Sequence, residues 1–177
     1  MVDPHGEIDR VLKILDEKHL KPIYILNTHS HWDHSAGNEE LAKKTGSKIV
    51  MYKTSPQQKD VAVQDGEIIK VGQLQIRVLF TPGHCPDEMC FIVGNRVLTG
   101  DTLFVGECGR TDLPGGNSEQ LWNSLFNKLL KLDDATEVYP GHDYGPTSSS
   151  TIGQERRTNY TLKPRTKDEF VRFMLEP

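Results

Sequence analysis

The stretch NTHSHWDHSAG at positions 27–37 places three histidines and one aspartate within six residues. These residues are His29, His31, Asp33 and His34. Imidazole and carboxylate groups are ligands that zinc, manganese and ferrous iron accept in proteins. Taken alone, the stretch fits either a metal site or a solvated polar loop, so the rest of the chain must decide between them.

Three more side chains of the same kind each come directly after a predicted strand. They are His84 in TPGH, Asp101 in TGDTLF and His142 in YPGHDY. Loops at the ends of a rigid sheet are where α/β folds gather functional residues. All together, five imidazoles and two carboxylates exceed what one four- or five-coordinate ion needs. We therefore predict two ions with one bridging carboxylate, an arrangement that lowers the pKa of a shared water towards neutrality.

Hydrophobic patterning predicts the elements that must position these residues. Helical spacing predicts helices over 7–19, 37–45, 118–132 and 166–175, the third capped by Asn117 or Ser118 and the last opened by a Thr166–Glu169 capping box. Short apolar or alternating runs predict strands over 23–26, 47–52, 67–71, 74–80, 89–93, 96–100 and 137–140. With no repeat or linker, this order predicts α/β layers in one domain, residues 1–177.

Composition restricts the class of protein further. The 177-residue chain has a formal net charge of −4 and no basic stripe, which argues against a nucleic-acid partner. No segment approaches the ~20 apolar residues of a membrane span, and the amino terminus lacks the pattern of a signal peptide. The three cysteines lack zinc-finger spacing. We expect a cytoplasmic protein with no membrane partner.

Read in chain order, THSHWDHSAG, TPGH, TGDTLF and YPGHDY resemble the successive metal-ligand motifs of the metallo-β-lactamase superfamily. GECGRTDLPGG at 106–116 and STIGQERRTN at 150–159 are similar to its glyoxalase II-like branch, which includes persulfide dioxygenases. The resemblance spans almost the whole chain and implies an αββα sandwich with the metals at one edge of two packed sheets. It assigns one metal to His29, His31 and His84, the other to Asp33, His34 and His142, with Asp101 bridging the two.

The resemblance implies a dinuclear hydrolase that cleaves a thioester of the hydroxyacylglutathione type. A metal-bound hydroxide would attack the carbonyl, and Asp33 would orient the nucleophile or hold its proton. Zinc is the favoured metal, and iron or manganese suit the same ligands. The alternative is a persulfide dioxygenase that holds a single Fe(II) through His29, His84 and Asp101. A metal-binding remnant without activity is the second alternative.

The substrate is expected to be a small molecule derived from a thiol. Arg110 could pair with its carboxylate, although anchoring the 106–116 loop is an equally good interpretation. Tyr144 could contact the substrate or serve in packing. We interpret Cys108 as a small buried residue, with a redox-sensitive thiol as the alternative.

Both ends of the chain depart from the family pattern. The family's Asp-Pro-Gly-Gly turn is Asp3-Pro4-His5-Gly6 here, and in the family it follows an opening set of strands. We therefore expect the first sheet to lack these strands, which predicts low stability or a homodimer formed through the exposed sheet edge. Some 35 residues follow His142, where glyoxalase II proper carries a helical glutathione-binding domain, so the thioester chemistry is better supported than that substrate.

Overall fold

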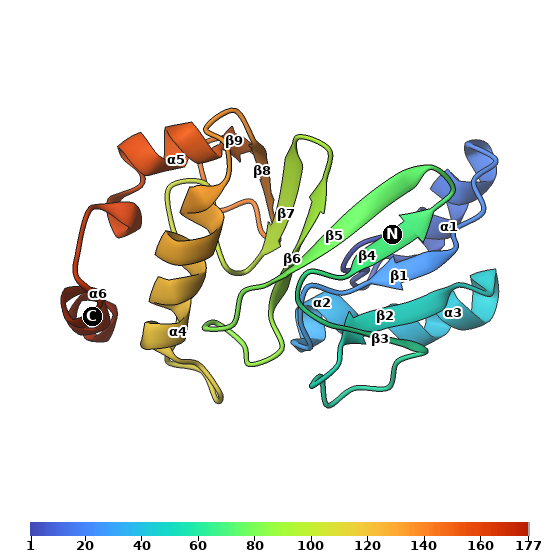
Figure 1. Ribbon diagram of the computed structural model, residues 1–177. Helices are drawn as coiled ribbons and strands as arrows, with labels where there is room; N and C mark the ends of the chain where they lie inside the picture. The colour runs from blue at the N-terminus through green and yellow to red at the C-terminus, as the bar shows by residue number, and fades with distance from the viewer. Residues whose placement is uncertain (177) are drawn as a thin grey trace.

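Two β-sheets lie face to face in the computed structural model, with helices on both outer sides (Figure 1). The structure describes residues 1–176. In chain order the elements are α1 (Ile8–Glu17), β1 (Tyr24–Leu26), α2 (Trp32–Ser35), α3 (Asn38–Thr45), β2 (Lys48–Tyr52), β3 (Val61–Val63), β4 (Ile68–Val71), β5 (Leu74–Phe80), β6 (Met89–Val93), β7 (Arg96–Gly100), α4 (Ser118–Trp122), η1 (Asn123–Lys128), η2 (Leu129–Lys131), β8 (Glu137–Pro140), β9 (Ser150–Thr151), α5 (Ile152–Thr158), η3 (Tyr160–Leu162) and α6 (Lys167–Leu175).

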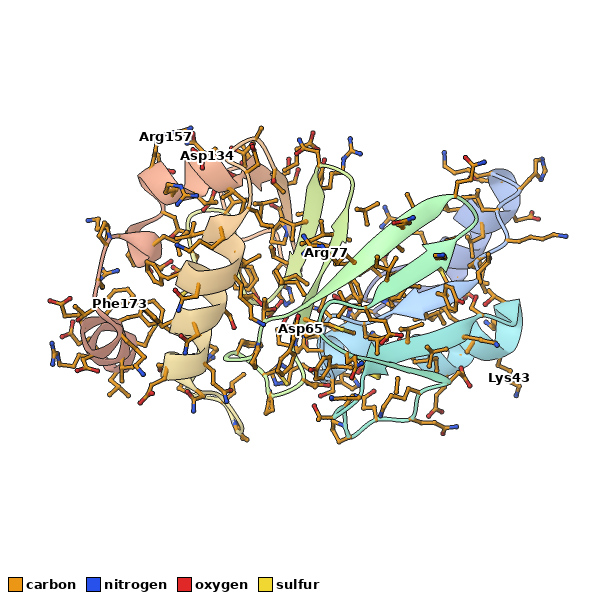
Figure 2. All side chains as sticks on the ribbon, viewed as in Figure 1. Lys43, Asp65, Arg77, Asp134, Arg157 and Phe173 are labelled. Carbon is orange, nitrogen blue, oxygen red and sulfur yellow. The ribbon has the colours of Figure 1, made fainter. Side chains whose placement is uncertain are left out.

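Alternation along β2 shows how the layers are held together. Ile49 and Met51 pack in the cluster beneath α1 and α3, whereas Val50 and Tyr52 pack in the cluster between the two sheets. Successive side chains of a strand point to opposite faces, so a strand that is apolar on both faces must lie between two layers. Figure 2 shows side chains filling the space between these layers.

A third apolar cluster lies between the second sheet and the carboxyl-terminal helices. Val97 and Val138 of the sheet share it with Leu121, Leu125 and Phe170 of the helices. The layers therefore run helix, sheet, sheet, helix, and the predicted αββα sandwich is confirmed.

Sheet topology brings several strand ends to one edge. The first sheet has the order β1-β2-β3, all parallel, and the second the order β4-β5-β6-β7-β8-β9. Pairs β5–β6 and β6–β7 are antiparallel and β7–β8 is parallel, so β5, β7 and β8 run in the same direction. Their carboxyl ends thus lie at the same edge of the sheet.

The predicted helix over 118–132 is confirmed as an α-helix only over Ser118–Trp122. Asn117 is its cap and accepts a hydrogen bond from the Gln120 backbone. From Asn123 the helix continues with π geometry and ends as a 3-10 turn. The capping box of Thr166 and Glu169 is confirmed, whereas the short strands β3 and β9 were not predicted.

The outer side of β1 pairs with the first residues of the chain through a parallel bridge between Val2 and Leu26. The backbone N–H of Leu26 donates to the carbonyl oxygen of Met1, and that of Asp3 donates to the carbonyl oxygen of Leu26, each at 2.9 Å. Beside it an apolar groove of about 420 Å³ runs between β1 and the β4–β5 hairpin, and we call it the β1 groove. Ile23 and Leu74 line it and are 52% and 48% exposed, so the groove presents apolar surface to solvent.

Candidate metal centre

Each predicted ligand lies just beyond the end of a strand. The loop after β1 holds the histidine cluster, in which His31 caps the single turn α2 and Asp33 and His34 lie within that turn. His84, Asp101 and His142 follow β5, β7 and β8. These strands end at one edge of the sandwich, so all seven predicted side chains are brought to one region.

The first group consists of His29, His31 and His84, with one ligand atom from each within 4.8 Å of the others. Nε2 of His29 lies 3.0 Å from Nδ1 of His31, and Nε2 of His84 lies 2.9 Å from the same atom. The rings of His31 and His84 are perpendicular, so three ring nitrogens converge from different directions.

The second group consists of Asp33, His34 and His142, again within 4.8 Å. The Nε2 atoms of His34 and His142 are 3.1 Å apart. Oδ2 of Asp33 lies 3.3 Å from Nε2 of His142. The side chain of Asp33 is 46% exposed, whereas His34 is buried, so this group opens to solvent on the Asp33 side.

Asp101 lies between the two groups. Its Oδ1 is 3.3 Å from Nε2 of His34, and its Oδ2 is 3.4 Å from Nε2 of His142 and 3.6 Å from Nε2 of His84. Oδ1 is buried and has no hydrogen-bond partner among the described residues. A buried carboxylate oxygen without a donor is costly, so this atom is suited to a cation.

Hydrogen bonds at the far side of two rings assign their tautomers. Nδ1 of His84 donates to the carbonyl oxygen of Arg110 at 2.9 Å, and Nδ1 of His34 donates to Oδ2 of Asp3 at 3.1 Å. A neutral imidazole has one N–H, so Nε2 of each ring presents a lone pair to the cluster. This arrangement of outer partners is the one that orients metal-binding histidines.

His29 has a similar outer environment. Its Nδ1 lies 3.1 Å from Oγ1 of Thr28 and 3.3 Å from Oε2 of Glu88. The Thr28 hydroxyl donates to Asp3, so its oxygen is an acceptor for the Nδ1 hydrogen of His29. Nε2 of His29 then faces Nδ1 of His31 with a lone pair. Nε2 of His84 presents its lone pair to the same atom of His31, which has at most one hydrogen to share, so the donor set fits a metal ion.

The electrostatics of the cluster favour a positive charge within it. Burial, together with the surrounding histidines, lowers the pKa of His29 far below its usual value. Burial also lowers the pKa of His34, but the neighbouring carboxylates of Asp101 and Asp3 outweigh it and raise the pKa to about 10. The carboxylates thus attract a cation, either a proton or a metal, to the place where the ring nitrogens meet.

Three supporting residues were not assigned to this site from the sequence. Asp3 was noted only as part of a turn, and Thr28 and Glu88 were not singled out. Asp3 accepts hydrogen bonds from the backbone and hydroxyl of Thr28. An acidic residue directly before the apolar strand β6 was the available signal for Glu88, because charged residues are rarely placed at the start of a buried strand.

A cavity of about 510 Å³ adjoins the candidate metal centre. Its lining includes His84, Asp101, Phe104, Glu107, Cys108, Arg110, Tyr144, Tyr160, Phe173, Met174 and Glu176. Residues from the carboxyl-terminal helix α6 therefore form part of its wall, and the cavity has the size of a small-molecule site.

The predicted substrate residues both line this cavity. Nε and Nη2 of Arg110 donate to the two carboxylate oxygens of Asp112, each at 2.5 Å. Tyr144 is 68% exposed and stacks on His142, with ring centroids 4.9 Å apart. Cys108 is buried, and burial raises its pKa to about 12, which fits the packing interpretation.

Comparison with known proteins places the chain in a family. The profile of the metallo-beta-lactamase superfamily matches residues 1–57 and 51–142. Hydroxyacylglutathione hydrolase of Pelagibacter ubique is 36% identical over 172 residues, covering 94% of this chain and 70% of that protein. This protein belongs to the metallo-beta-lactamase superfamily.

Similarity extends to a protein with a different activity. The mitochondrial persulfide dioxygenase ETHE1 of Homo sapiens is 33% identical over 181 residues, covering 98% of this chain and 70% of that protein. The crystal structure of ETHE1 from Myxococcus xanthus has a TM-score of 0.94 and 38% identity, and the match covers 98% of this chain and 78% of that one. The chain spans only 44% of a beta-lactamase hydrolase-like protein of Agrobacterium fabrum.

Within residues 1–176 no helix has both the length and the apolar character needed to cross a membrane. The cytoplasmic location, the single domain and the lack of a nucleic-acid partner stay predictions.

Proposed function

We propose that this protein is a dinuclear metal-dependent hydrolase that cleaves a thioester in a small thiol-derived molecule. The observation that carries the proposal is the gathering of six ligand side chains into two groups with Asp101, the seventh, between them. Hydroxyacylglutathione hydrolase of Pelagibacter ubique, a relative of 36% identity, supports this type of reaction.

The geometry supports the ligand sets that the family resemblance implies. One ion would be held by His29, His31 and His84, and the other by Asp33, His34 and His142, with Asp101 shared between them. When bound, two divalent ions supply a hydroxide nucleophile near neutral pH and polarise the carbonyl group that it attacks. Zinc is the metal we favour, and iron or manganese suit the same ligands.

Asp33 is the ligand best placed to handle a proton. Its carboxylate is half exposed and lies on the solvent side of the cluster, 3.3 Å from Nε2 of His142. It can therefore orient a water molecule and accept its proton while that proton passes to solvent. A thiolate leaves without much help from an acid, so the reaction needs no further proton donor.

The adjoining cavity would bind the substrate. Arg110 is its one guanidinium group, with Phe104 and Tyr144 beside each other at a ring-centroid distance of 5.1 Å. Asp112 occupies two N–H groups of Arg110, which leaves the remaining hydrogens of the fork for a substrate carboxylate. The aromatic pair would contact the apolar part of the substrate.

A second candidate is an iron-dependent persulfide dioxygenase. The match to Myxococcus xanthus ETHE1, at a TM-score of 0.94 over 98% of this chain, favours this reaction. It would use only His29, His84 and Asp101, two imidazoles and one carboxylate that suit ferrous iron. The remaining ligands would then surround a single ion without holding a second.

Metal content and turnover of the same preparation distinguish the two reactions. Protein purified without added metal would be analysed for bound ions, then assayed for cleavage of a glutathione thioester and for oxygen consumption with glutathione persulfide. The hydrolase requires two ions per chain and thioester cleavage. One iron per chain with oxygen consumption would establish the second candidate instead, and bound metal with neither activity would contradict both.

A further inference from the structure

Glu88 is a buried carboxylate that contacts two of the candidate ligands. Its side chain is 0% exposed. Oε1 accepts the backbone N–H of Asp101 at 3.0 Å, and Oε2 lies 3.3 Å from Nδ1 of His29. Oε2 is buried and has no hydrogen-bond partner among the described residues. The carboxylate thus links the loops after β1 and β7, which lie in different sheets.

The surrounding backbone is shaped to admit this carboxylate. Gly100 has a φ of +51°, and a Cβ at that position would lie 2.5 Å from Oε1 of Glu88 and 2.6 Å from the Thr28 side chain. A larger residue would therefore displace Glu88 from Asp101. A buried carboxylate with only one firm hydrogen bond is unfavourable for stability alone, so its position calls for another explanation.

We infer that Glu88 is a positioning residue of the candidate metal centre, which keeps the hydrogen of His29 on Nδ1 and fixes the backbone that carries Asp101. The inference rests on the proposed metal centre but not on which reaction it catalyses. With the Nδ1 hydrogen facing Oγ1 of Thr28 at 3.1 Å and Oε2 of Glu88 at 3.3 Å, the lone pair of Nε2 faces the cluster and is free to bind a cation.

Replacement by glutamine separates this role from simple packing. Glu88→Gln keeps the shape of the side chain but replaces one acceptor oxygen with an NH₂ donor. If the amide oxygen faces the Asp101 N–H, the NH₂ group faces Nδ1 of His29. In the opposite orientation, the NH₂ group meets the Asp101 N–H. In the first orientation the NH₂ group opposes the Nδ1 hydrogen of His29, or this hydrogen moves to Nε2, where it blocks the metal. In the second orientation the NH₂ group opposes the N–H donor of Asp101.

The test measures Co²⁺ affinity of metal-stripped full-length protein, through visible absorption in competition with a chelator. Glu155→Gln is the matched control, because Glu155 is also buried and accepts hydrogen bonds from Gly106 and Asn159 without contacting a candidate ligand. We expect Co²⁺ affinity to fall by about 10- to 100-fold in Glu88→Gln, the effect of losing an outer partner of a ligand. Glu155→Gln should stay within about twofold of the wild type, since it leaves these partners in place.

Nitrogen-15 NMR of the histidine rings provides a second measurement, and its wild-type part does not depend on the variant folding. In the wild-type protein His29 should carry its hydrogen on Nδ1, and in Glu88→Gln the Nε2 form should gain population. Unchanged Co²⁺ affinity in a folded Glu88→Gln, an equal loss in Glu155→Gln, or an Nε2 hydrogen on His29 in the wild type would each overturn the inference. A wild type that binds no Co²⁺ would instead reject the proposed metal centre.

Discussion

The carboxylate of Asp3 lies 3.1 Å from Nδ1 of His34, which ties the amino-terminal turn to a side chain 31 positions away. The same carboxylate accepts the backbone N–H of Thr28 at 2.8 Å and its hydroxyl at 2.7 Å. The turn is therefore part of the frame that orients the histidine loop. Glycine at position 5 is not needed for these contacts, so the histidine found there leaves them intact.

Asp3→Asn should weaken metal binding at the group that contains His34. The amide would turn its NH₂ donor towards Nδ1–H of His34 when its oxygen serves Thr28, which disfavours the tautomer that binds a metal. We expect a 10- to 100-fold loss of affinity for one of two ions, measured as metal content after dialysis against a graded chelator. Asp9→Asn, on the exposed face of α1, is the control. Full metal content in Asp3→Asn would contradict the role given to this turn.

His31→Ala separates the two proposed reactions. His31 belongs to the first ligand group but not to the three residues that suffice for a single iron. If the protein is a dinuclear hydrolase, thioester cleavage should fall on the order of 100-fold or more, since the nucleophile depends on both ions. Asp101→Ala should abolish either reaction. Thioester cleavage at the wild-type rate in His31→Ala would argue against a two-metal hydrolase.

Arg110→Ala and Asp112→Ala decide whether the arginine binds substrate or anchors its loop. If Arg110 pairs with a substrate carboxylate, its loss should raise KM about tenfold with little change in kcat, because that contact is equally present before and during the reaction. Asp112→Ala would leave the guanidinium free and should not raise KM. Steady-state kinetics of both variants provide the measurement. Equal changes in the two variants would favour the loop-anchoring role.

Phe170→Ala should destabilise the carboxyl-terminal layer. Phe170 is fully buried in the cluster between the second sheet and the helices, with its ring 5.9 Å from that of Phe126. Removing a buried phenylalanine side chain costs about 3–5 kcal/mol in the free energy of unfolding. Urea unfolding would measure it, with Leu175→Ala as the control because Leu175 is 76% exposed on the same helix. A loss below about 1 kcal/mol would show that α6 is not part of the cooperative core.

The β1 groove predicts association of two copies of the chain. The exposed side chains Ile23 and Leu74 in this groove offer apolar surface to a second chain. Light scattering over a range of concentrations should show a dimer, and Ile23→Lys should shift it to monomer. Ile14→Lys, exposed on α1 outside the groove, should leave the dimer unchanged. A stable wild-type monomer at all concentrations would refute the prediction.

Strand-end positions of the ligands were predictable because the signals are local. In the sequence, an apolar run comes before each of four ligands, His29, His84, Asp101 and His142. In the structure, each of these runs forms a strand that ends just before the ligand. Strand β3 was missed because only Val63 of its three residues is fully buried, so its apolar pattern is weak. The π geometry after Trp122 has no sequence signal of its own, since Ser124 and Leu125 suit an α-helix equally well.

The sequence by itself determined the family, the layered fold and the types of side chain available to bind metal, because each depends on residue identity and short-range periodicity. Only the tertiary structure decided how closely those side chains approach one another, with Asp101 within 3.6 Å of His34, His84 and His142. It also decided that Asp3 and Glu88 face the outer nitrogens of His34 and His29. Such contacts join residues from separate strands and turns, and their distances follow from the packing of whole layers.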